Sequence, residues 1–231
     1  MSIAAAAATV HTDMTPLEIN ARRGLWATVV WSALLCYATF THQPPYKTDF
    51  AAWARYVTTT GFLVEHLLGS ILGAGVGTLG FMALALALTD RGAPRIAVWT
   101  LATTVLGNTL VTAVFGIAAF AQPAIGRAFL AGHADAAALY DDVNGAPLMI
   151  TAASGMLLIS AGLILGGVGV ARSGLAPRLA GAAIAVGGPL FAIVGVIMAD
   201  FVQSIGAALL AIGTASTAWA GRRLPKPPFH V

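Results

Sequence analysis

Charged side chains are scarce in this sequence. Only 9% of its 231 residues are Asp, Glu, Lys or Arg, whereas 58% are hydrophobic. Soluble domains carry about 25% charged residues, so the composition excludes a soluble globular protein. It also leaves no stretch of chain that reads as a separate soluble domain.

Cysteine and catalytic motifs are nearly absent as well. Cys36 is the single cysteine, so no disulfide can form within the chain and no zinc motif exists. The sequence has no nucleophile elbow, phosphate-binding loop or metalloprotease motif. We therefore predict no catalytic residues and no metal ligands. The basic residues are dispersed along the chain, which argues against a nucleic-acid partner despite the net charge of +3.

Six long apolar segments fill most of the chain. A helix needs about 20 mainly apolar residues to span a bilayer, and we predict spans over about 24–41, 61–88, 96–121, 148–171, 179–199 and 202–220. These spans form one transmembrane domain, 24–221, between tails at 1–23 and 222–231. The predicted fold is all-α, a polytopic six-transmembrane-helix bundle. Short helices lying on the membrane surface are expected in the two longer loops, 42–60 and 122–147.

The basic residues alternate between the two ends of these spans. One end and both tails hold nine of the twelve: Arg22, Arg23, Arg91, Arg95, Arg172, Arg178, Arg222, Arg223 and Lys226. The other end holds Lys47, Arg55 and Arg127. Because cytoplasmic loops are enriched in Lys and Arg, we predict a multi-pass plasma-membrane protein with both termini in the cytoplasm.

Polar side chains in the spans suggest one site. Glu65 and His66 are the only ionisable residues in 61–88, where such groups are costly and need partners. The topology places further polar residues in the same outer third of the bundle, where most of the polar inventory is expected. The candidate ligand or polar site consists of Glu65, His66, Asn108, Thr112, Asp200 and Gln203. The alternative is an internal staple in which Glu65 or His66 hydrogen-bonds Asn108, Thr112 or Gln203.

Glycines recur at helical spacing along several spans, which is typical of helices that approach closely in lipid. The helix-packing positions we predict are Gly69, Gly73, Gly77, Gly162, Gly166, Gly188 and Gly195. Pro189 lies inside its span and should disturb the helix there. The lipid bilayer, other membrane subunits or a second copy of the chain are the partners that such faces predict.

A turn of Leu175, Ala176, Pro177 and Arg178 leads into the glycine-rich fifth span, and the second span carries an acid. In this layout the chain resembles uncharacterised bacterial integral membrane proteins with six or seven spans, a domain family of unknown function. The resemblance implies no activity, cofactor or site residue.

Three functions fit these observations. The first is a non-catalytic accessory or assembly subunit of a larger membrane complex, which needs only packing faces. The second is a small-solute or proton-coupled transporter or receptor, with an outward-facing polar pocket at Glu65 and His66. The third is a redox protein that binds haem or quinone, with His66 as a haem ligand and Met149, Met156 or Met198 as a second one.

Overall fold

The structure is a computed structural model that describes residues 16–39, 43–198 and 200–223. Every regular element in that part of the chain is helical, as the sequence predicts. In chain order the elements are α1 (Pro16–Ala38), α2 (Phe50–Val57), α3 (Thr60–Val64), η1 (Glu65–Leu72), α4 (Gly73–Asp90), α5 (Pro94–Gly116), η2 (Ile117–Ala121), α6 (Gln122–Leu130), α7 (Ala136–Val143), α8 (Ala146–Ser173), α9 (Arg178–Pro189), η3 (Leu190–Val194), α10 (Gly195–Met198) and α11 (Asp200–Arg223). The three η segments are π-helical.

Several of these elements join end to end into long rods. Five rods are long and apolar enough to cross a membrane: Thr60–Asp90, Pro94–Leu130, Ala146–Ser173, Arg178–Met198 and Phe201–Arg223. The chain is therefore built as a helical membrane protein. α1 is a sixth rod of 23 residues. It is less apolar because every 18-residue stretch of it contains both Arg22 and Arg23.

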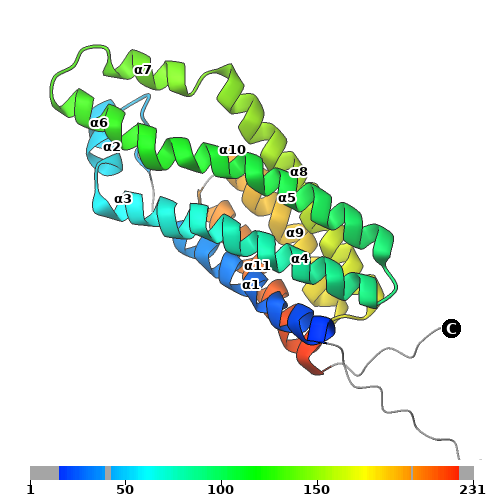
Figure 1. Ribbon diagram of the computed structural model, residues 1–231. Helices are drawn as coiled ribbons and strands as arrows, with labels where there is room; N and C mark the ends of the chain where they lie inside the picture. The colour runs from blue at the N-terminus through cyan, green and yellow to red at the C-terminus, as the bar shows by residue number, and fades with distance from the viewer. Residues whose placement is uncertain (1–15, 40–42, 199, 224–231) are drawn as a thin grey trace, which may run out of the picture.

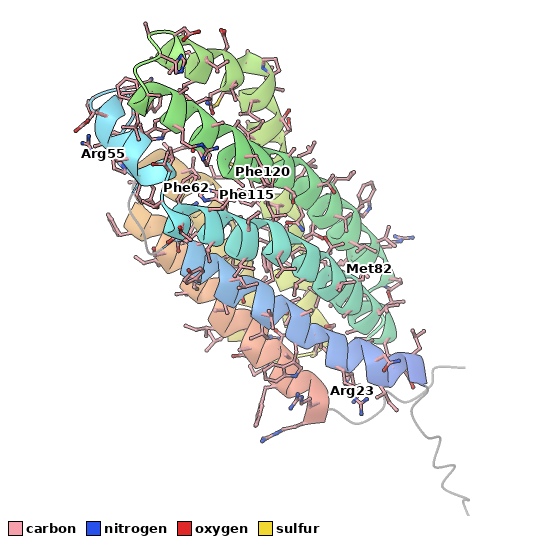
Figure 2. All side chains as sticks on the ribbon, turned by 60° about the vertical axis from the view of Figure 1, so that its left-hand side comes forward. Arg23, Arg55, Phe62, Met82, Phe115 and Phe120 are labelled. Carbon is pink, nitrogen blue, oxygen red and sulfur yellow. The ribbon has the colours of Figure 1, made fainter. Side chains whose placement is uncertain are left out.

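The six rods form a closed ring in chain order. α1 packs on α4, α4 on α5, α5 on α8, α8 on α9 and α9 on α11, and α11 packs back on α1. In Figure 1 the start of α1 and the end of α11 lie together at one end of the elongated bundle, and α2, α6 and α7 lie at the other. We call these the terminal end and the cap end. Figure 2 shows Arg23 at the terminal end and Arg55 at the cap end.

Glycines let neighbouring rods of the ring touch backbone to backbone. A methyl group added at Gly107 of α5 would come within 2.8 Å of the carbonyl oxygen of Gly155 on α8, and one at Gly187 of α9 would come as close to the carbonyl oxygen of Gly206 on α11. Real side-chain carbons do not approach that closely, so only glycine permits these distances.

The predicted packing glycines all lie against other rods of the same chain. Gly69, Gly73 and Gly77 lie against α1, Gly162 and Gly166 against α5, Gly188 against α8, and Gly195 against α11. The glycine-rich faces are thus occupied within the ring itself.

The short helices at the cap end do not offer their apolar faces to the membrane, contrary to the prediction of surface-lying helices. Trp53 and Val57 of α2 are fully buried, and α2 packs against α6. Aromatic rings hold the contact, with centroids 4.8 Å apart for Phe50 and Phe129 and also for Trp53 and Tyr140. We call this cluster the aromatic cap. The apolar face that predicted membrane contact buries itself in protein instead.

The third rod is longer than the sequence suggests. We predicted that it ends at 121, before Gln122 and Pro123, but the helix continues to Leu130. The π-helical segment Ile117–Ala121 immediately precedes Pro123, and such a local widening accommodates the missing N–H of proline. α7, at eight residues, is correspondingly short, and Asn144 is its C-cap residue.

Buried hydroxyl groups extend farther toward the terminal end than the sequence analysis expected. Thr28, Thr104, Thr214 and Thr217 are buried there, so the polar inventory is not confined to the outer third. Each donates a hydrogen bond to a carbonyl oxygen of its own helix. A hydroxyl that is satisfied in this way can be buried at any depth at little cost.

Candidate functional site

A cavity of about 250 Å³ lies inside the ring and reaches the cap end. All six rods contribute to its wall, for example through Leu35 of α1, Asn108 of α5, Ile159 of α8 and Gln203 of α11. Tyr56 of α2 and Gln43 line it from the cap side. We call it the central cavity.

The π-helical segment η1 delivers the ionisable residues to this cavity. Glu65, His66 and Ser70 line it, and Ala74 of α4 continues the row. Glu65 and Ser70 are five residues apart, which is the hydrogen-bond spacing of a π-helix. Regular α-helical spacing over 61–88 would put His66 on the same face as Gly69, Gly73 and Gly77, with Glu65 at the edge of that face. In the structure the glycines lie against α1, while Glu65, only 8% exposed, lines the cavity.

His66 is held by its own helix. Its Nδ1 donates to the carbonyl oxygen of Phe62, 2.9 Å away, and its ring packs on the Phe62 ring at a centroid distance of 4.1 Å. The Phe62 ring in turn packs edge-on against Tyr56, at 5.5 Å. Because Nδ1 carries the hydrogen of the neutral ring, Nε2 keeps the lone pair and can accept a hydrogen bond or bind a ligand.

Asn108 joins two rods and also lines the cavity. Its Nδ2 donates to the carbonyl oxygen of Ala74, at 2.6 Å, and to Thr78 Oγ1, at 3.0 Å. Asn108 of α5 is thus hydrogen-bonded to another helix, α4. These contacts fix the orientation of the amide, because a carbonyl oxygen can only accept.

Of the remaining predicted site residues, one lines the cavity and one does not. Gln203 lines the cavity with Glu65, His66 and Asn108, whereas Thr112 does not. The Thr112 hydroxyl donates to the carbonyl oxygen of Asn108, at 2.7 Å. The side chain of Asp200 lies outside the described part of the chain.

The internal staple does not involve His66 bonded to Asn108. His66 hydrogen-bonds Phe62, and Asn108 hydrogen-bonds Ala74 and Thr78. His66 and Asn108 therefore both line the central cavity, but they are held by different parts of the protein. His66 is hydrogen-bonded to its own helix, and Asn108 is hydrogen-bonded to α4.

Sequence reasoning missed the aromatic wall of the cavity. Trp31, Tyr56, Phe115 and Phe191 line it, and Figure 2 shows Phe115 and Phe62 in the cap half of the bundle. Phe191 lies in η3, which follows Pro189 directly, so the proline was the one sequence signal for this part of the wall. The aromatic residues themselves were indistinguishable from lipid-facing ones.

The described wall of the central cavity carries an acidic side chain but no lysine or arginine. Among the described residues that line the cavity, Glu65 is the only Asp or Glu, and none is Lys or Arg. Within the described residues, no three His, Cys, Asp or Glu side chains group closely enough to hold a metal ion. The wall thus offers a carboxyl group, an imidazole, amide groups and aromatic faces.

The wall does not fit a haem. Met156 lines the cavity with His66, but Met149 and Met198 are 59% and 71% exposed and lie outside it. The volume of about 250 Å³ falls below the roughly 300–1,000 Å³ typical of drug-sized ligand sites. A macrocycle with His66 and Met156 as axial ligands would need more room than these side chains leave.

Comparisons with models of known protein families, with curated proteins and with solved structures find no match. The chemistry of the central cavity is therefore the guide to function.

Proposed function

We propose that this protein is an integral membrane protein that binds a small cationic solute in the central cavity, in the manner of a receptor or carrier. The observation that carries the proposal is the cavity itself. It is enclosed by every rod of the ring, and its described lining combines one carboxyl group with aromatic faces and no Lys or Arg.

Each part of the wall suits such a solute. The Glu65 carboxylate would attract the positive charge, and aromatic faces such as those of Trp31 and Phe191 would add cation–π attraction. His66 Nε2 would accept a hydrogen bond from the solute. A cavity of about 250 Å³ has room for only a small molecule.

The membrane arrangement is part of the proposal. We take all six rods as membrane spans, with the terminal end in the cytoplasm of a plasma-membrane protein. The described residues support this by charge, since eight arginines lie toward the terminal end and only Lys47, Arg55 and Arg127 toward the cap end. Under this arrangement the cavity receives its solute from outside the cell.

The accessory-subunit hypothesis has less support. It drew on glycine faces more extensive than a compact bundle requires, yet those glycines lie against rods of the same chain. Exposed apolar side chains such as Leu79 and Val98 need no protein partner, because lipid would cover them. A redox role is disfavoured by the poor fit to haem.

Thermal unfolding of the purified protein in detergent tests the proposal. We expect tetramethylammonium or methylammonium to raise the unfolding midpoint and acetate to leave it unchanged. Glu65→Gln should weaken binding of the cation at least about tenfold, since it removes a charged partner. Asp142→Asn, a matched loss of one exposed carboxylate at the cap end, should keep the response. Equal responses to cations and acetate, or a full response in Glu65→Gln, would overturn the proposal.

His66→Gln separates a binding role from a structural one. If His66 contacts solute, the variant should lose affinity for the cation while its midpoint without solute stays near that of wild type. A lowered midpoint with unchanged affinity would assign His66 to the support of the helix alone.

A further inference from the structure

A second cavity, of about 490 Å³, opens at the terminal end, between the turn joining α4 to α5 and the last turn of α8. Three arginines line it, Arg91, Arg95 and Arg172, together with Ser173. No Asp or Glu is among its described lining residues. We call it the arginine cavity.

The packing of the two helix ends brings these arginines together. Ile96 of α5 lies over Gly169 of α8, where an added methyl group would be 3.0 Å from the Ile96 side chain. Arg95 precedes Ile96, and Arg172 is one turn beyond Gly169. Three cations are thus held around one cavity by the close approach of α5 to α8.

The start of α5 is electrostatically unfavourable as it stands. Its N-cap residue, Ala93, has no side chain that can cap, no acid occupies its first turn, and Arg95 puts a positive charge there. A helix N-terminus favours negative charge, so Arg95 opposes the helix dipole. An anion in the cavity would satisfy both the free N–H groups and the arginine.

Asp90 and Glu18 line a separate cavity, together with Arg22 and Arg91 itself, so Arg91 lies between the two cavities. Burial, and secondly the charge of Arg22, lower the pKa of Arg91, while Asp90 raises it. Additional negative charge beside Arg91 would therefore relieve repulsion in this region.

We propose that the arginine cavity binds a phosphate group, as the headgroup of an anionic membrane lipid or as free phosphate. Arginine pairs with phosphate oxygens through two parallel hydrogen bonds, and basic pockets between helix ends on the cytoplasmic side bind anionic lipid headgroups. Trp99, one turn above Arg95, is 63% exposed, and exposed tryptophan is typical of the membrane–water boundary. This site is independent of the solute in the central cavity.

Native mass spectrometry of the detergent-solubilised protein tests the site. We expect wild-type protein to retain phosphatidylglycerol in preference to phosphatidylcholine. Arg95→Gln with Arg172→Gln should weaken phosphatidylglycerol binding roughly 30-fold, which corresponds to about 1 kcal/mol for each charge removed. Both arginines are exposed, so the double variant should fold, and an unchanged elution volume on size exclusion would check this.

The matched control is Arg23→Gln with Arg178→Gln, which removes two exposed charges at the same end but outside the cavity. This control should keep most of the binding. If inorganic phosphate in large excess displaces the lipid, free phosphate is the ligand; if it does not, the lipid headgroup is. Unchanged lipid binding in the Arg95 and Arg172 double variant, or an equal loss in the control, would overturn the proposal.

Discussion

The two halves of the ring pack differently. Rods meet backbone to backbone in both halves, as where Gly167 of α8 faces Gly181 of α9 toward the terminal end and where Gly195 lies against the backbone of Gln203 on α11 toward the cap end. Toward the terminal end, side chains such as Leu88 and Val170 are also fully buried. Toward the cap end, π-helical segments and aromatic side chains surround an open cavity. The same six rods therefore form a solid core at one end and a binding chamber at the other.

Polar groups divide along the same line. Hydroxyls in the terminal half such as those of Thr28 and Thr214 donate to their own helices and need no space, although Thr100 Oγ1 is buried there without a hydrogen-bond partner among the described residues. Glu65, His66 and Asn108, whose groups a helix backbone satisfies less completely, all lie at the cavity. The comparison teaches that the depth of a polar residue matters less than whether its own helix can satisfy it.

The largest expected effect comes from overfilling the solid half. Gly167→Ala would put a methyl group against the backbone of α9 at Gly181. We expect the free energy of unfolding to fall by about 1–3 kcal/mol, measured as a lower thermal midpoint in detergent.

Gly75→Ala is the control for that substitution. Nothing lies within 4 Å of the added methyl group at Gly75, so alanine should raise stability by up to about 1 kcal/mol through helix propensity. If both alanines shift the midpoint in the same direction, the close backbone contact at Gly167 does not decide the effect of the added methyl group.

A smaller effect is expected where the chamber wall is tied together. Asn108→Ala removes the hydrogen bonds from α5 to Ala74 and Thr78 of α4. The loss should be about 1 kcal/mol of unfolding free energy, read from the thermal midpoint. Thr109→Ala, at an exposed position that bonds only its own helix, should change it by less than about 0.5 kcal/mol. Equal losses would mean that Asn108 does not tie the wall.

A pair of hydroxyl groups tests how much one hydrogen bond between two rods contributes to stability in the terminal half. Ser32 Oγ and Thr214 Oγ1 are 2.9 Å apart and connect α1 to α11, where the ring closes. A double-mutant cycle with Ser32→Ala and Thr214→Val should give a coupling of about 0.6 kcal/mol. A coupling near zero would show that the internal bonds of each hydroxyl already suffice.

The smallest effect concerns the aromatic cap and depends on pH. Burial, and secondly the neighbouring Tyr46 and then Asp141, raise the pKa of Tyr140 from 10.0 to about 12. The folded protein keeps a proton that the unfolded chain releases, so this residue's contribution to stability is complete below pH 10 and is lost as the pH rises to about 12. The measurement is the absorbance of ionised tyrosine against pH in wild type and in Tyr140→Phe. The difference between the two curves should show the ionisation of Tyr140 near pH 12. A step near pH 10 in the folded protein would contradict the burial.

Much of the architecture could be read from local pattern. Long apolar runs predict helices because a chain in lipid must satisfy its backbone internally, and helices cover the predicted spans within the described residues. The break expected before Pro123 was wrong, since a widened helical turn can absorb a proline.

Only some residues of the candidate site could be predicted from the sequence. Glu65, His66, Asn108 and Gln203 could be proposed together because a charge or amide in an apolar run is conspicuous and topology sets its depth. Ser70, Trp31 and Phe115 carry no such signal, because serine and aromatic residues are ordinary in any membrane helix. Their place in the wall depends on which neighbours the ring supplies.

The sequence by itself determined that this is a helical membrane protein, where its helices run and which few residues are costly to bury, because these follow from hydrophobicity along a single segment. Only the tertiary structure decided that the six rods close into a ring, that the glycine faces are used within it and that a cavity remains at one end. Those outcomes depend on the local widening of helices and on contacts between residues far apart in the chain, and neither is written in the periodicity of any one segment.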